Sequence, residues 1–368
     1  NTACAEAIYA QIKDLPIIDY HCHLDERKIA ANTGFENIGE LWLAGDHYKW
    51  RAMRLCGVPE EYVTGHADYR EKFIRYAGIL PKLAGNPLYI WTHLELRQIF
   101  GIREPLNAAS AERIWTQANA VLKTLRVRDL LDRFRVEYVA TTDDPAGDLQ
   151  AHGTYGHTVV APTFRPDKLT TLDEAYIQLL GMRAGVKIDT LDDLLLALVS
   201  RLDFFVRKGC RIADHGFMRF PKRYAEKAEA EKLFASRVAL TESDRDAFFG
   251  FLLTWFAREY AKRNMLMQLH FSVVRNNNAA MFGQCGADSG FDLIGAEQSV
   301  GDLVAFFNRV PDAERPQTVL YTLNDNNLSA VAAVTGAFRN VRMGAAWWFN
   351  DTVAGIRNNL SVLYEYAA

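Results

Sequence analysis

The chain has 368 residues, of which 49% are hydrophobic and 24% are charged, so it is long enough for one large globular domain or two smaller ones. Its 42 basic and 45 acidic residues give a formal net charge of −3, which argues against a nucleic-acid-binding surface. No run suggests a membrane helix or a signal peptide, and the five cysteines have no Cys-x-x-Cys spacing, so we expect a cytoplasmic protein without a disulfide framework.

The first predicted strand is the apolar run "PIIDYHCH" at 16–23, which carries two histidines one residue apart. Successive strand side chains alternate between faces, so His21 and His23 project to the same side, as does Asp19. Neutral imidazoles bind divalent metals, which makes the two histidines candidate metal ligands. The alternative is that they only form hydrogen bonds at the end of the strand.

The same strand pattern recurs along the chain, and each copy is a short apolar run that ends in polar or ionisable residues. Helical patterns separate most of the copies, which predicts parallel strands covered by helices. We therefore expect an α/β fold, a (β/α)₈ TIM-type barrel formed by residues 1–25 and 129–368, although only seven strands are found and the eighth is missing from this sequence. The seven runs are 16–23, 136–144, 158–168, 210–217, 265–271, 318–325 and 341–351.

Residues 26–128 separate the first and second predicted strands and read as helices punctuated by Gly, Pro and Asn. This connection is far longer than a usual crossover, so we interpret it as a helical insertion over the mouth of the barrel. It contains "GDHYKW", in which His47 and Tyr48 are candidates for proton transfer. The alternative is that His47 is a surface residue and Tyr48 an amphipathic anchor.

The chemistry of such barrels lies at the carboxyl ends of the strands, where several further candidates are found. His270 is a candidate for metal binding or proton transfer, and Arg165 and Arg275 offer planar guanidinium groups that match a substrate carboxylate. Each of these residues could instead be a solvated or paired side chain. Strand alternation turns only one of Trp347 and Trp348 inward. The residues suited to orienting the metal ligands are Asp143, Asp144, Asp214 and His215.

Eight segments between residues 16 and 351 together resemble the uronate isomerases of the amidohydrolase superfamily. They include several long stretches with rare residues, which makes the resemblance far more specific than the histidine pair alone. The segments are "DYHCHL", "ELWLAGDHYKWRAMR", "NPLYIWTHLELRQIFGI", "TTDDP", "PTFRPDK", "QLHFSVVRNNN", "GADSGFD" and "GAAWWFND".

The resemblance implies a distorted (β/α)₈ barrel that interconverts D-glucuronate with D-fructuronate and D-galacturonate with D-tagaturonate. It also implies a divalent metal, usually zinc, a hexuronate as the small-molecule substrate, and a homo-oligomer. The last strand of the family carries a metal-binding aspartate and then a substrate-binding arginine, neither of which has a counterpart here. The matched residues are His21 and His23 as metal ligands, His47, Tyr48 and His270 as catalytic residues, and Arg165 with Trp347 or Trp348 as substrate-binding residues.

Such an isomerase moves a proton between adjacent carbons through an enediol, helped by a metal acting as a Lewis acid. A second interpretation keeps the scaffold but makes the protein a metal-dependent hydrolase of a small acidic substrate. A third is a non-catalytic sugar-acid binder. No Walker loop and no serine nucleophile elbow is found in the sequence, so metal chemistry has no strong competitor among enzyme classes.

Overall fold

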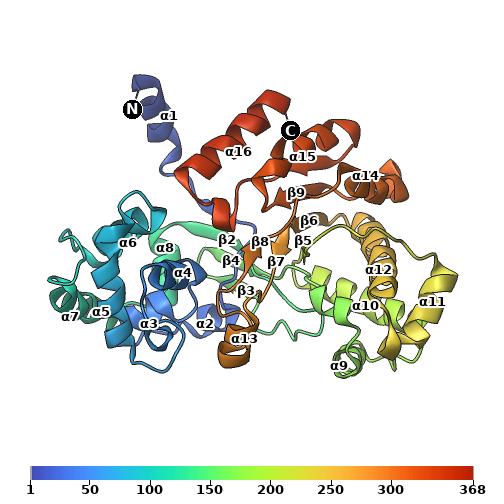
Figure 1. Cartoon of the computed structure of the whole chain (residues 1–368), viewed down its shortest axis with the longest axis horizontal. Coiled ribbons are helices and arrows are strands. Elements are labelled where there is room, and N and C mark those ends of the chain that lie inside the picture. Colours follow the sequence, from blue (N-terminus) through green and yellow to red (C-terminus); the bar gives the residue numbers. More distant parts are fainter. Residues whose placement is uncertain (1, 368) are drawn as a thin grey trace.

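The computed structural model describes residues 2–367, in which short parallel strands lie at the centre and helices surround them (Figure 1). Each of the seven predicted runs contains one strand of this central set, which confirms the α/β prediction and its strand positions. The strands are β1 (Ile17–Asp19), β2 (Val136–Ala140), β3 (Gly153–Tyr155), β4 (Thr158–Ala161), β5 (Ile212–Gly216), β6 (Leu266–Phe271), β7 (Val273–Val274), β8 (Leu293–Ile294), β9 (Thr318–Thr322) and β10 (Val341–Met343).

The central strands form two four-stranded sheets, in the orders β1-β2-β4-β3 and β10-β9-β6-β5. All their pairings are parallel except that of β3 with β4. Single parallel bridges from Phe164 to Asp143 and to Ala213 connect the two sheets just beyond β4. Seven parallel strands therefore follow one another as β1-β2-β4-β5-β6-β9-β10, and within the described residues this series stays open between β10 and β1.

Three strands were not expected from the sequence. The strand β3 pairs antiparallel with β4, and the turn that joins them contains Gly156 with a φ of +63°. The strands β7 and β8 pair in a separate two-stranded antiparallel sheet. All three strands have two or three residues and, unlike the equally short β1 and β10, do not lie within one of the seven predicted runs.

The helices form on amphipathic stretches that have strong start signals. Thr190 with Asp193 and Thr241 with Asp244 form capping boxes at the starts of α10 and α12, which satisfy backbone N–H groups that lack helical partners. Within the described residues, no helix combines the length and apolar character needed to cross a membrane.

Seven of the α-helices, α2 to α8, lie between β1 and β2 in the chain, and Figure 1 colours them blue to green. The α-helices are α1 (Ala3–Ile12), α2 (Glu26–Ala31), α3 (Ile38–Leu43), α4 (His47–Leu55), α5 (Tyr69–Ile79), α6 (Pro87–Phe100), α7 (Ala111–Leu122), α8 (Val127–Arg133), α9 (Glu174–Ala184), α10 (Leu191–Arg207), α11 (Lys227–Ala235), α12 (Glu242–Lys262), α13 (Ala279–Cys285), α14 (Val300–Arg309), α15 (Leu328–Ala337) and α16 (Val353–Tyr366). The 3₁₀ turns are η1 (Glu60–Tyr62), η2 (Leu80–Leu83), η3 (Asp167–Thr171), η4 (Arg237–Ala239), η5 (Asp312–Glu314), η6 (Asp325–Asn327) and η7 (Trp348–Asn350).

The buried apolar residues fall into separate clusters. The largest packs α9, α10, α12, α14 and α15 against β5, β6, β9 and β10, and it includes Phe164, Phe205 and Phe271. A second cluster lies entirely between residues 38 and 125 and contains Phe73 and Tyr76. The helices α3 to α7 therefore have a core of their own, while the predicted insertion boundaries at 26–128 stay a prediction.

Candidate active site at the carboxyl ends of the strands

Three predicted residues from three different strands meet at one point. His21 follows β1, Asp214 lies in β5 and His270 lies in β6, and one ligand atom from each lies within 4.8 Å of the others. Nδ1 of His270 is 2.6 Å from Oδ1 of Asp214, and the His21 ring stacks on the His270 ring with 4.7 Å between centroids. The carboxyl ends of parallel strands thus gather two imidazoles and one carboxylate.

The register of β5 and β6 explains why Asp214 belongs to this cluster. Gly216 lies opposite His270 and Asp214 opposite Gln268, so Asp214 and His270 are diagonal neighbours on one face of the sheet. The next residue, His215, points to the other face, where its Nε2 lies 3.0 Å from the Tyr260 hydroxyl. The sequence made Asp214 and His215 equal candidates for orienting the metal ligands, whereas only Asp214 contacts the other residues of the cluster.

Burial and neighbouring charges set the protonation states in the cluster. Burial, above all, lowers the pKa of His21 to about 4, so its imidazole is neutral at pH 7. Burial by itself would raise the pKa of Asp214, but His270 and Arg165 together hold this pKa well below its usual range. A neutral imidazole and an ionised carboxylate are the forms in which these side chains bind metals.

The unpartnered atoms in the cluster fit a divalent metal. Among the described residues, Nδ1 of His21 and Oδ2 of Asp214 are buried without a hydrogen-bond partner, and Oδ2 has only the Arg165 guanidinium at 3.2 Å. Buried polar atoms are nearly always satisfied, so unpartnered ones at such a cluster indicate a missing partner. Nitrogen and oxygen donors of this kind suit zinc and related divalent ions.

Arg165 is held beside the cluster by two carboxylates. Its Nε donates to Oδ2 of Asp167 at 2.8 Å, and its Nη1 lies 3.2 Å from Oδ2 of Asp214. Oδ2 of Asp167 also accepts the backbone N–H of Gly216 at 3.1 Å, which anchors the arrangement to β5. Burial by itself would lower the pKa of Arg165, but the two carboxylates raise it, so the guanidinium stays charged.

Gly216 leaves the space in which the Arg165 guanidinium lies. A Cβ atom at this position would come within 2.6 Å of Nη2 of Arg165, closer than real side chains approach. We expect Gly216→Ala to displace the flexible guanidinium, leave the thermal unfolding temperature nearly unchanged and reduce kcat/KM about tenfold or more, the effect of losing one charged hydrogen bond. Steady-state kinetics with a thermal melt would check this, and unchanged kcat/KM would contradict it.

The two adjacent tryptophans have different surroundings. The Trp347 ring packs edge-on against the His270 ring, with 4.8 Å between their centroids. The Tyr321 ring stacks on the same His270 ring, with 4.4 Å between centroids. Trp348 has a φ of +50°, which breaks the strand alternation and turns the chain toward His47, whose ring centroid is 6.3 Å away. Tyr321, which the sequence did not single out, therefore belongs to the surroundings of the cluster.

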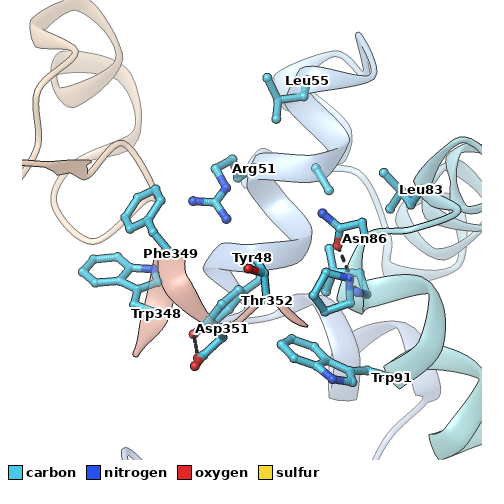
Figure 2. Close-up of a pocket in the computed structure, with 13 residues that line it drawn as sticks. Tyr48, Arg51, Leu55, Leu83, Asn86, Trp91, Trp348, Phe349, Asp351 and Thr352 are labelled. Atoms are coloured by element: carbon cyan, nitrogen blue, oxygen red, sulfur yellow. Dashed lines mark hydrogen bonds between the residues drawn. The ribbon is translucent and has the colours of Figure 1, made fainter. Parts of the chain in front are cut away.

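His47 and Tyr48 open α4, and both face the loop that follows β10. The His47 ring stacks on Trp50, and the Tyr48 hydroxyl donates to Oδ2 of Asp351 at 2.7 Å. A cavity of about 80 Å³ lies here between the helices and η7, as Figure 2 shows. The helical segment and the loop after β10 thus meet at this cavity.

Other predicted residues lie around the cluster or apart from it. His23 has its ring centroid 5.3 Å from that of His21 but is not part of the three-residue cluster, and desolvation and then Arg165 lower its pKa. Arg275 is paired with Asp292 at 2.9 Å. Of the predicted acids, Asp143 lies 3.2 Å from His152, and Asp144 accepts the Tyr176 hydroxyl at 2.9 Å. These two acids support neighbouring loops instead of the cluster.

Parallel strands whose carboxyl ends gather imidazoles, a buried carboxylate and a guanidinium define an α/β enzyme with a candidate metal site. The family model described as glucuronate isomerase matches residues 1–367. A uronate isomerase of Halalkalibacterium halodurans is 40% identical over 382 positions, which cover 97% of this chain and 80% of that protein. The chain therefore belongs to the glucuronate isomerase family and is an isomerase.

Solved structures agree with this assignment. The uronate isomerase of Thermotoga maritima superposes with a TM-score of 0.95 at 32% identity, covering 100% of this chain and 83% of that one. The glucuronate isomerase of Caulobacter crescentus gives a TM-score of 0.93 at 29% identity, covering 99% of this chain and 80% of that one. The chain thus spans about four-fifths of the relatives that it matches.

Proposed function

We propose that this isomerase interconverts D-glucuronate with D-fructuronate, and D-galacturonate with D-tagaturonate, at the cluster of His21, Asp214 and His270. The observation that carries the proposal is this buried donor set beside the charged Arg165. His23, which follows the same strand as His21, completes the proposed metal ligands. Zinc is the proposed metal because imidazole and carboxylate donors suit it.

The proposed reaction moves one proton from C2 of the aldose to C1, and the hydroxyl proton of C2 goes to the C1 oxygen. When bound, a divalent metal supplies Lewis-acid stabilisation of the negative charge that develops on oxygen. Arg165 binds the substrate carboxylate with the donors that Asp167 and Asp214 leave free. His47 and Tyr48 hold and move protons, and Trp347 and Trp348 cover the site from the loop after β10.

The distorted (β/α)₈ barrel is also part of the proposal. Seven parallel strands in series support it, because a series that is open only between β10 and β1 needs one further strand to close. The side chains of Ile17 and Ile18 at the β1 edge are 44% and 54% exposed, which is unusual for the wall of a barrel. An eighth strand paired with β1 would cover this edge.

The function is tested by following D-glucuronate with NMR in the presence of the full-length protein. We expect D-fructuronate to form, the conversion to stop after chelation, and zinc to restore it, because the donor set fits a divalent metal. A panel of lactones serves as the control for hydrolysis. Conversion that survives complete metal removal would contradict the metal proposal, and lactone cleavage without isomerisation would favour a hydrolase.

A further inference from the structure

One face of α4 is fastened to the loop that follows β10. Tyr48 and Arg51 are three residues apart and therefore point to the same side of the helix. The Tyr48 hydroxyl donates to Oδ2 of Asp351 at 2.7 Å, and the Arg51 guanidinium lies 4.2 Å from the centre of the Phe349 ring. Figure 2 shows these two contacts side by side across the cavity. Residues about 300 positions apart in the chain thus fix the start of α4.

Further contacts hold the same helix from its other end. Nη2 of Arg54 donates to the Ser289 carbonyl at 2.8 Å, and its guanidinium stacks 3.9 Å from the centre of the Phe291 ring. Arg54 also forms an ion pair with Glu60 at 2.6 Å. These contacts hold the far end of α4 at a second place, independent of the contact between Tyr48 and Asp351.

Asp351 is itself held firmly. Its backbone N–H donates to the Trp348 carbonyl at 3.0 Å, and the next residue, Thr352, caps α16 by accepting the Gly355 N–H at 2.9 Å. Among the described residues, no lysine or arginine forms an ion pair with the Asp351 carboxylate, whose side-chain partner is the Tyr48 hydroxyl. A half-buried carboxylate without a neighbouring cation has little to compensate its loss of hydration, so it adds little to the stability of the fold.

We infer that Asp351 is the positioning residue of Tyr48, an inference that rests on the role proposed for Tyr48 in proton transfer. By accepting the hydrogen bond of the phenol, the carboxylate fixes the rotation of the hydroxyl and turns the lone pairs of the phenol oxygen toward the substrate. When Tyr48 takes a proton from the substrate, its own proton passes to the Asp351 carboxylate. A tyrosine without this partner would rotate freely and meet the substrate in many orientations, which lowers the fraction of productive encounters. Asp351 acts only through Tyr48 and does not touch the substrate.

The test compares Tyr48→Phe, Asp351→Asn and the double variant in the metal-loaded, full-length enzyme. We expect Tyr48→Phe to lower kcat by about 100-fold or more, the usual contribution of an acid or base group. Asp351→Asn should lower kcat about tenfold, the value of one charged hydrogen bond, and leave KM within about twofold. The double variant should be no slower than Tyr48→Phe, because the two groups act in series.

A matched control and a conservative variant separate positioning from a structural effect. Asp325 is an exposed aspartate at the start of η6, which follows the neighbouring strand β9, and Asp325→Asn should leave kcat unchanged. Asp351→Glu keeps the carboxylate and should recover part of the kcat that Asp351→Asn loses. Thermal melts of all variants should agree within a few degrees, since the other contacts of α4 remain.

The outcomes distinguish this inference from the proposed function. If Tyr48→Phe retains wild-type turnover, the proposed role of Tyr48 fails and the inference fails with it. If Tyr48→Phe is slow but Asp351→Asn has wild-type kcat, or if the double variant shows the product of both losses, only the inference is overturned. A glutamate variant as slow as the asparagine variant would also count against positioning by the carboxylate.

Discussion

Replacing Asp214 by Asn should lower kcat by about 100-fold or more and weaken zinc binding by a similar factor, as expected for a group that orients or binds a metal. Asp214 is fully buried and lies 2.6 Å from His270 and 3.2 Å from Arg165. Asparagine has nearly the same shape but no charge, so it leaves the guanidinium without its buried counter-ion. Metal content after dialysis and steady-state kinetics would measure the two effects.

The control for this variant is an aspartate paired with an arginine far from the cluster. Asp203 on α10 lies 2.8 Å from Arg263, and Asp203→Asn should leave activity unchanged and cost less than about 1 kcal/mol of stability, as exposed ion pairs do. An Asp214→Asn enzyme that binds zinc and turns over like the wild type would show that this cluster is not the metal site.

Replacing Arg165 by Lys should lower kcat/KM for D-glucuronate about 100-fold, because two charged hydrogen bonds of the planar guanidinium are lost together. Arg165 bridges Asp167 and Asp214 and keeps further donors for a substrate carboxylate. A lysine ammonium is a compact point charge without the planar fork of donors of a guanidinium. It therefore cannot contact Asp167, Asp214 and the substrate carboxylate at the same time. The loss should appear mainly as a higher KM, since the carboxylate is bound in both ground and transition states.

The measurement that isolates the carboxylate contact compares D-glucuronate with D-glucose, which lacks the carboxylate. The wild-type enzyme should prefer the uronate strongly, and Arg165→Lys should reduce this preference without affecting any residual activity on glucose. Arg263→Lys, which changes a paired arginine distant from the cluster, is the control. An unchanged preference in the Arg165 variant would remove Arg165 from the substrate-binding residues.

The strand positions follow from the sequence, because the two-residue period of a strand is a local property. Each of the seven predicted runs contains a strand, and His21 lies two residues after the first strand ends at Asp19. The short strands β3, β7 and β8 were not predicted, since they lie outside the longer apolar runs that reveal β1 and β10. The seven-strand parallel order also followed from alternating strands and helices, whereas closure of a barrel stays a proposal.

The tertiary structure alone decided which of the candidate side chains meet. Asp214 joins His270 because of the register between β5 and β6, and register is set by strands that are distant in sequence. The left-handed backbone at Trp348 separates the two tryptophans, and no local pattern predicts it. The hydrogen bond from Tyr48 to Asp351 joins residues that are 303 positions apart, so it depends on how the helical segment packs against the strands. The sequence by itself thus determined the elements and the kinds of chemistry that they carry, whereas long-range packing determined the site, because contacts between distant segments leave no periodic signal in the chain.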